Sequence, residues 1–192
     1  MKRLALLCGA LLMFAGIASA QDEAPKVEAF GGYSYLRVNP GFGGAPGLNF
    51  NGGSGSLAYN FTPTLGVVAD FGGYHWSQSS VDATAVSYLF GPKLALRHGA
   101  ITPFAQVLFG GAHASGDFSG LICPSARVRP QVSGCSVSGS ENAFAMTAGG
   151  GVDWNATTHI GIRLIQAEYL MTRFASETQN NVRVSTGVVF RW

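Results

Sequence analysis

The chain has 192 residues, of which only 11% are charged, against about 25% in an ordinary soluble domain. Its formal net charge of +2 is too small to indicate a nucleic-acid-binding protein, and no basic stripe with interleaved aromatic residues is present. We therefore expect that something other than water covers much of the surface and that nucleic acid is not a partner.

The first twenty residues, MKRLALLCGALLMFAGIASA, have the layout of a cleavable signal peptide. Lys2 and Arg3 precede an apolar run that ends in the small-residue sequence ASA, so we expect cleavage after Ala20 and a mature domain over residues 21–192. A membrane anchor is the alternative, but the run is short and the polar QDEAPK follows it. Lipidation at Cys8 is disfavoured because a leucine, not a small residue, precedes it.

Beyond residue 20, no apolar run reaches the roughly 18 residues that a membrane helix needs. A chain that enters a membrane without such a helix must form a closed barrel, because only helices and barrels satisfy every backbone hydrogen bond in lipid. The alternation typical of barrel strands recurs along the chain. From Asn181 to Trp192, for example, valine and aromatic residues occupy one parity, whereas polar and small residues, including Arg183 and Arg191, occupy the other.

Eight such segments are predicted, and an even number suits closure. They span residues 26–38, 50–61, 65–74, 84–97, 101–114, 142–154, 160–174 and 182–192. Every second connection is short, which is typical of tight periplasmic turns alternating with longer outside loops. Proline removes a ladder donor, so a bulge or shifted pairing is expected at Pro92. The predicted fold is an all-β, eight-stranded, antiparallel, up-and-down transmembrane barrel.

The inner parity carries small, polar and charged residues. The charged ones are Asp70, Lys93, Arg97, Asp153, Arg163, Glu168, Arg183 and Arg191. A soluble lipocalin-like barrel would instead be apolar inside. We expect the basic residues to share partners among the three acidic ones, because an unpaired charge on the lipid face costs about 2–4 kcal/mol at the midplane. Arg163 and Glu168 differ in parity, so both can point inward only if a bulge separates them.

The last strand carries Ser185, Gly187, Phe190 and Trp192, which resemble the terminal signal of bacterial outer-membrane proteins. With GGYSYLRV, AGGGVDW, IRLIQAEYLMTRF and NNVRVSTGVVFRW, the chain resembles the OmpA-like and opacity-type family of small outer-membrane β-barrels. The resemblance implies a narrow barrel in the bacterial outer membrane whose lumen is filled by side chains. It also implies outer-membrane lipid, lipopolysaccharide and the barrel-assembly machinery as partners, a structural or adhesin-like role toward an unidentified surface ligand, and no catalytic residues or cofactor.

One motif favours an alternative function. His113-Ala114-Ser115 resembles the His-x-Ser of outer-membrane lipid A deacylases, where a base and a nucleophile on one strand face would suit ester hydrolysis. The expected continuation is replaced by Gly116-Asp117, and Arg127 stands where an acidic partner belongs. A non-enzymatic barrel is therefore favoured, with a lipid-modifying enzyme or a narrow pore as alternatives.

Cys123 and Cys135 are the only cysteines after residue 20. An exported protein meets an oxidising compartment, so we expect these two residues to form a disulfide in an outside loop. Metal binding is the alternative, but two cysteines without a nearby histidine pair fall short of a tetrahedral set.

Overall fold

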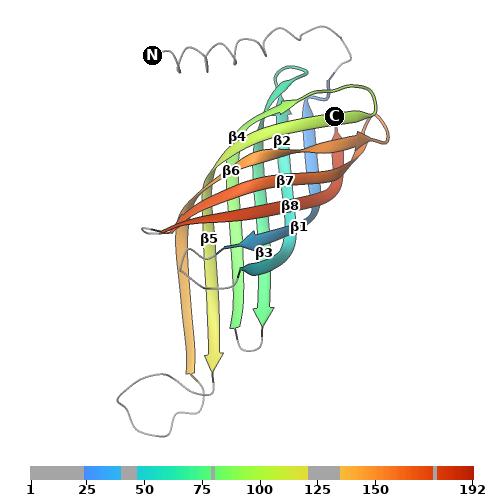
Figure 1. Ribbon diagram of the computed structural model, residues 1–192. Coiled ribbons are helices and arrows are strands. Elements are labelled where there is room, and N and C mark those ends of the chain that lie inside the picture. The colour runs from blue at the N-terminus through green and yellow to red at the C-terminus, as the bar shows by residue number, and fades with distance from the viewer. Residues whose placement is uncertain (1–23, 40–46, 79–80, 121–134, 175–176) are drawn as a thin grey trace, which may run out of the picture.

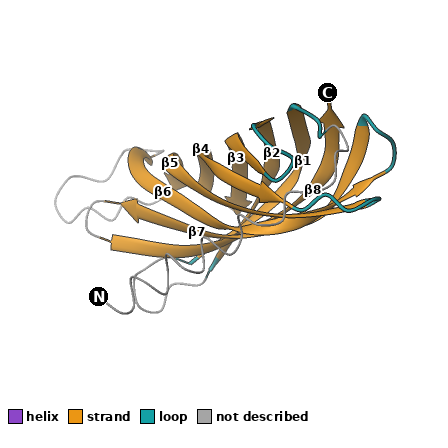
Figure 2. Ribbon diagram, turned by 90° about the horizontal axis from the view of Figure 1, so that it is seen from above, coloured by secondary structure: helices purple, strands orange, loops and turns teal. Residues whose placement is uncertain are grey.

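The computed structural model describes residues 24–39, 47–78, 81–120, 135–174 and 177–192, which form a closed antiparallel barrel (Figures 1 and 2). Its strands are β1 (Val27–Val38), β2 (Leu48–Asn60), β3 (Leu65–Gln78), β4 (Val81–Ala95), β5 (Ile101–Gly120), β6 (Cys135–Asn155), β7 (Ile160–Phe174) and β8 (Glu177–Arg191). Each strand pairs with the next in sequence, and β1 pairs with β8. The predicted fold is confirmed. The expected signal peptide lies outside the described residues.

The barrel has two ends, which we name by their connections. The turn end carries three short connections and the C-terminus, marked C in Figure 1, and the loop end is the opposite one. In the described part of the chain, helical segments with the length and apolar character for crossing a membrane are not found.

Strands at the loop end are longer than the sequence predicted. β5 continues to Gly120 and β6 begins at Cys135, so residues expected in one long loop instead pair with each other, for example Ser115 with Ser140. Likewise β3 continues to Gln78, β4 begins at residue 81 and β8 at residue 177. Alternation of apolar and polar residues stops where one face no longer meets lipid, but backbone pairing does not depend on that contrast.

The expected irregularity at Pro92 is absent from the pairing of β4. The β4–β5 ladder omits Gly91 and Pro92, yet Phe90 still pairs with Phe109 and Lys93 with Gln106, which is one continuous register. On the other side, Pro92 pairs with Val67 without a shift. Proline therefore removes a backbone donor from the ladder here without shifting its register.

A true irregularity lies in β7. The register with β8 shifts between Arg163 and Gln166, and the adjacent residues Leu164 and Ile165 both face outward, 53% and 50% exposed. The extra outward residue changes the parity along the strand, so that Arg163 and Glu168 are both buried in the lumen.

Two of the turns at the turn end repeat one local structure. The hydroxyl oxygen of Thr62 accepts a hydrogen bond of 2.9 Å from the backbone N–H of Leu65, and that of Thr157 accepts one of 2.9 Å from Ile160. A threonine side chain thus replaces a backbone acceptor in each turn. The remaining turn contains Gly99 with φ of +56°, a conformation that glycine adopts without steric cost.

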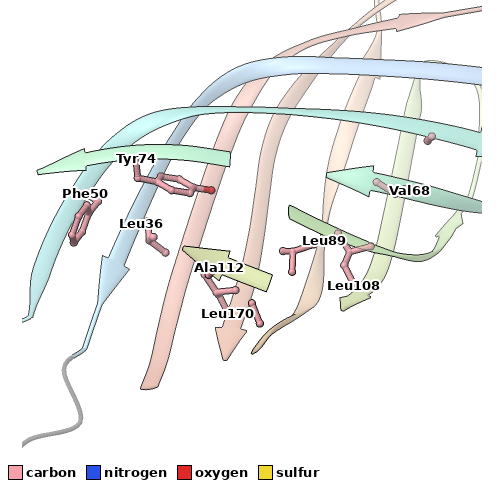
Figure 3. Packing of buried hydrophobic residues seen from close by; sticks show 10 residues of the cluster. Leu36, Phe50, Val68, Tyr74, Leu89, Leu108, Ala112 and Leu170 are labelled. Atoms are coloured by element: carbon pink, nitrogen blue, oxygen red, sulfur yellow. The ribbon is translucent and has the colours of Figure 1, made fainter. Parts of the chain in front are cut away.

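Most of the apolar core lies in the lumen toward the loop end (Figure 3), whereas Ala58 and Val68, which pair with each other, lie nearer the turn end. Its buried members are Leu36, Phe50, Ala58, Val68, Tyr74, Leu89, Leu108, Ala112, Ala145 and Leu170, with Val38, Leu48, Trp76, Ala83 and Ala85 packed against them. We call this set the apolar layer. It comes from seven strands, so it can form only when the barrel closes.

Candidate functional site

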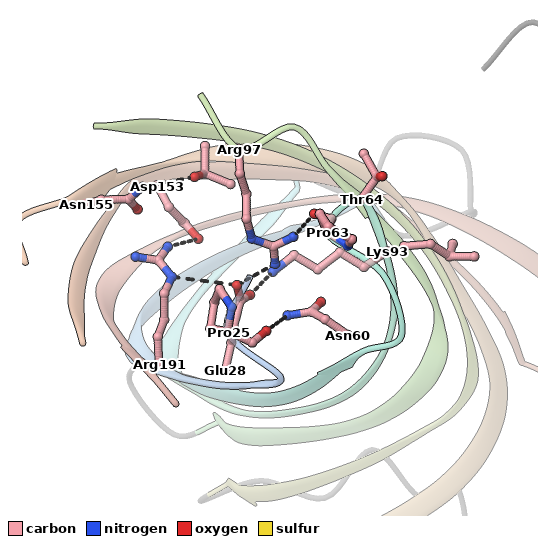
Figure 4. Close-up of polar contacts among 12 residues, drawn as sticks. Pro25, Glu28, Asn60, Pro63, Thr64, Lys93, Arg97, Asp153, Asn155 and Arg191 are labelled. Carbon is pink, nitrogen blue, oxygen red and sulfur yellow. Dashed lines mark hydrogen bonds and ion pairs between the residues drawn. The ribbon is translucent and has the colours of Figure 1, made fainter. Parts of the chain in front are cut away.

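The lumen at the turn end contains a group of ion pairs that we call the turn-end cluster: Glu28, Lys93, Arg97, Asp153, Arg163 and Arg191. Glu28 lies at its centre (Figure 4). The ammonium of Lys93 is 2.6 Å from its Oε2, and Arg97 Nη2 is 2.7 Å from its Oε1. Arg191 approaches the same Oε1 at 3.6 Å. One carboxylate therefore joins β1 to β4, β8 and the turn after β4.

Asp153 is the second anion of this cluster. Its Oδ1 accepts from Arg163 Nε at 2.8 Å, and its Oδ2 accepts from Arg191 Nη2 at 3.2 Å. The Arg163 guanidinium also lies over the rings of Phe30 and Phe104, 4.3 Å from each centroid. Cation–π contacts are strongest where the cation is desolvated, so Arg163 is held both by its carboxylate and by its two ring neighbours.

A second group, the central cluster, lies between the turn-end cluster and the apolar layer and consists of Asp70, Tyr74, Gln106, Glu168 and Arg183. Arg183, 1% exposed, donates to Asp70 Oδ1 at 2.6 Å and to Glu168 Oε2 at 2.6 Å. The Tyr74 hydroxyl is 3.3 Å from Arg183 Nη1. Gln106 donates to the other oxygen of Glu168 at 2.8 Å. The guanidinium thus connects β3, β7 and β8 across the lumen.

Pairing makes these buried charges tolerable. The two clusters contain five cations, Lys93, Arg97, Arg163, Arg183 and Arg191, and four anions, Glu28, Asp70, Asp153 and Glu168. Removing one partner of a buried pair costs about 3–5 kcal/mol, because it leaves an uncompensated charge. The buried charges that fill this part of the lumen therefore depend on one another for their stability.

The structure places all eight predicted charged residues on the inner face, with Arg97 16% exposed at the turn end. The predicted partners were wrong for Lys93 and Arg97, which pair with Glu28 instead. Sequence reasoning missed Glu28 because apolar residues occur at both parities of β1. A usable signal was present, since Glu28 shares its parity with the buried Phe30.

Toward the loop end the lumen changes character. Most buried residues beyond the central cluster belong to the apolar layer, in which Leu89 and Leu108 are fully buried (Figure 3), and the buried Thr172 and Asn181 share a hydrogen bond there. The described lumen therefore combines an ionic half and an apolar half, and both halves are filled by side chains.

The predicted terminal signal takes part in barrel closure. Ser185 hydrogen-bonds through its hydroxyl to Ser34 of β1. Gly187 approaches the β1 backbone so closely that a Cβ there would lie 2.3 Å from the carbonyl oxygen of Gly31. A larger residue would force the two strands apart.

The two aromatic residues of the signal lie on the outer face. The rings of Phe190 and Trp192 are stacked, 6.4 Å apart, and Trp192 is 63% exposed. The backbone of Trp192 exchanges hydrogen bonds of 2.9 and 3.1 Å with Val27. Its role as an assembly address stays a prediction.

The His-x-Ser motif lies on the outer face of β5. His113 Nδ1 is 2.9 Å from Asn142 Oδ1, while Ser115 pairs in register with Thr84 and Ser140. Within the described residues, no hydrogen bond joins His113 to Ser115. The base and the nucleophile that ester hydrolysis requires are therefore not brought together.

Two expected features fall outside what the structure describes. Cys123 is among the undescribed residues, so the disulfide with Cys135 stays a prediction, and Arg127 is undescribed too. Across the described ranges, His, Cys, Asp and Glu side chains form no group of three that could hold a metal ion.

Comparison with known proteins agrees with this architecture. The family model for the outer membrane protein β-barrel domain matches residues 6–191. A search of curated proteins gives no match.

Among solved structures, the attachment invasion locus protein Ail of Yersinia pestis is 20% identical with a TM-score of 0.61, over 87% of this chain and 99% of Ail. Neisserial surface protein A is 10% identical with a TM-score of 0.60, over 89% of this chain and 100% of its own. OprG of Pseudomonas aeruginosa is 10% identical with a TM-score of 0.52, over 88% and 96%. Each of these is a small outer-membrane barrel with the same fold. This chain is a bacterial outer-membrane protein and belongs to the outer membrane protein β-barrel domain family.

Proposed function

We propose that this protein is a non-enzymatic, closed barrel that anchors an outside hairpin and serves a structural or adhesin-like role. The observation that carries the proposal is the filled lumen. Two ionic clusters occupy the turn end and the centre, and the apolar layer occupies the loop end. Ion pairs such as Glu28–Lys93 and Asp70–Arg183 join strands across the lumen and so obstruct a path for solutes.

The outside hairpin is the part available for contact. β5 and β6 have 20 and 21 residues, whereas a tilted strand needs about 9–11 to cross the hydrocarbon core. The hairpin that they form extends away from the turn end (Figure 1), and its segments Ser115–Gly120 and Cys135–Ser140 are rich in serine and glycine.

The adhesin-like role can be tested on bacteria that express the full chain. Replacing residues 116–139 by an Asn-Gly turn shortens the hairpin at paired positions, since Ser115 pairs with Ser140. We expect binding to host cells or matrix to fall to the level of non-expressing bacteria. The variant must still show heat-modifiable mobility on a gel, which reports a folded barrel. Undiminished binding by a folded variant would contradict the adhesin-like role.

A ligand class for this assay comes from a structural neighbour. Ail has been solved in complex with the heparin analogue sucrose octasulfate. We propose the same analogue as a competitor, which should reduce binding by the intact protein if its surface ligand is also a sulfated glycan. A lack of competition would exclude that ligand class without affecting the hairpin experiment.

The two alternative functions have their own measurements. In planar bilayers the closed barrel should give no steady conductance, and a stable channel would favour the pore. Lipid A from cells that express the intact chain or Ser115→Ala should have the same acyl composition. Loss of an acyl chain that depends on Ser115 would favour the deacylase.

A further inference from the structure

The outer face of the barrel carries hydrogen-bonded pairs near the loop end in all four hairpins that open there. In each pair, a tyrosine or histidine ring on one strand contacts an amide or hydroxyl group on the next strand. The pairs are Tyr33–Asn51, Tyr35–Asn49, His75–Thr84, His113–Asn142 and Tyr169–Asn180. We call these ten residues the outer belt.

Half of the outer belt, including Asn180, lies at one height above the turn end. Five of its members lie twelve positions from an exposed apolar residue that is the last residue of the same strand at the turn end or the residue next to that end. They are Asn49 from Phe61, Thr84 from Leu96, His113 from Ile101, Asn142 from Trp154, and Asn180 from Trp192. At about 3.4 Å per residue and a tilt of about 45°, twelve residues span about 29 Å of the membrane normal. This equals the hydrocarbon thickness, so these five residues, Asn180 among them, lie at the outer boundary of the membrane.

Two arginines lie beside one member of the outer belt, Asn180. On the outer face of β8, Asn180 lies between Val182, which pairs with Arg37 of β1, and Thr178, which pairs with Arg173 of β7. Both arginines are therefore diagonal neighbours of Asn180, with Cα atoms about 7–8 Å away. Arg37 and Arg173 are exposed.

The described hydrogen bonds around Asn180 use its oxygen atoms as acceptors. The Tyr169 hydroxyl donates to Asn180 Oδ1 at 2.5 Å, and the Asn180 carbonyl oxygen accepts from Asn39 at 2.9 Å. Both acceptors are thus occupied, whereas no described side chain accepts from Asn180 Nδ2. Among the acidic residues whose side chains the structure describes, which do not include Glu177, none is within ion-pair distance of Arg37 or Arg173.

We propose that Arg37, Asn180 and Arg173 form a phosphate-binding site for the headgroup of lipopolysaccharide in the outer leaflet. Guanidinium groups bind phosphate through paired N–H donors, and the amide supplies a further donor between them. The site faces lipid at the membrane boundary, where the phosphates of lipid A lie. Basic residues at that level are typical of lipid headgroup recognition.

The test uses the mature protein in phosphatidylcholine nanodiscs, titrated with lipopolysaccharide and followed by native mass spectrometry. The variant is Arg37→Gln with Arg173→Gln. The matched control is Lys26→Gln, which removes an exposed cation at the turn end. We expect the Kd for lipopolysaccharide to rise about tenfold for each arginine removed, as loss of one charged hydrogen-bonding group implies, and to stay constant in the control.

Two further probes identify the ligand. Lipopolysaccharide that has lost its lipid A phosphates should bind the wild-type protein as weakly as the double variant binds the intact glycolipid. Phosphatidylglycerol should bind at least tenfold more weakly than lipopolysaccharide. Equal affinity for phosphatidylglycerol would overturn lipopolysaccharide as the occupant, and an unchanged Kd in the double variant would overturn the site.

A second variant controls for misfolding. Asn180→Asp places a carboxylate between Arg37 and Arg173, where it would pair with both arginines and compete with phosphate. It should weaken lipopolysaccharide binding while heat-modifiable mobility is retained. Wild-type affinity in a folded Asn180→Asp protein would also overturn the proposal.

Discussion

The two halves of the lumen solve the same problem in different ways. At the turn end and in the centre, side chains from distant strands are joined by directed ion pairs, such as that between Arg183 and Asp70. At the loop end, Leu89 and Leu108 pack without direction. A barrel lumen can thus be filled by directional ion pairs or by non-directional apolar packing. Mutations in the two regions should therefore lower the free energy of unfolding by different amounts and for different reasons.

The largest effect is expected in the central cluster. Arg183→Met leaves Asp70 and Glu168 as adjacent buried carboxylates without a counterion, so the free energy of unfolding should fall by about 3–5 kcal/mol. Urea titration of the refolded barrel, followed by tryptophan fluorescence, measures this change. In the triple variant that adds Asp70→Asn and Glu168→Gln, most of the loss should be recovered, and a triple variant as unstable as the single one would contradict the charge explanation.

A slightly smaller effect is expected in the apolar layer. Leu108→Ala creates a cavity among fully buried neighbours, and such changes cost about 2–5 kcal/mol. We expect about 3 kcal/mol in the same titration. A conservative substitution in each region gives a matched comparison. Leu108→Met should lower the free energy of unfolding by less than about 1.5 kcal/mol. Arg183→Lys should lower it by more, because lysine lacks the planar guanidinium that reaches two carboxylates. Equal costs would remove the distinction between the two halves.

The turn-end cluster should be more tolerant than the central one. Glu28→Gln removes the shared anion of Lys93, Arg97 and Arg191, but Arg97 is partly exposed to water and Arg191 keeps Asp153 as a partner. We expect a loss of about 2 kcal/mol, below that of Arg183→Met. If both variants lose the same stability, burial depth does not control the cost.

The smallest effect is expected outside the lumen, in the repeated turns. Thr62→Ala and Thr157→Ala each remove a side-chain acceptor for a backbone N–H at an exposed turn. Each should cost about 0.5–1.5 kcal/mol, and the two should be additive because the turns share no contact. Unfolding titrations of the two single variants and the double variant test both statements. A cost above that of Leu108→Ala would show that the turns, and not the lumen, dominate stability.

The sequence by itself determined which face of most strands meets lipid. In β8, for example, the alternation of Val182 and Arg183 identified the lipid-facing and lumen-facing sides. Successive side chains of a strand point to opposite faces, so this assignment needs only neighbouring residues. The opposite parity of Arg163 and Glu168 even located an irregularity that the register of β7 contains. The turn pattern fixed the number of strands and hence the closed fold.

Only the tertiary structure decided which charges meet and how far the strands continue. Glu28 binds partners on strands that are far apart in sequence, and their proximity depends on the stagger of the closed barrel, which alternation does not encode. The same holds for the site around Asn180, where Arg37 and Arg173 come together only through the pairing of β8 with both β1 and β7. Toward the loop end, β5 and β6 remain paired over residues that lack an alternation of apolar and polar types, so the sequence carries no pattern that marks how far these strands continue.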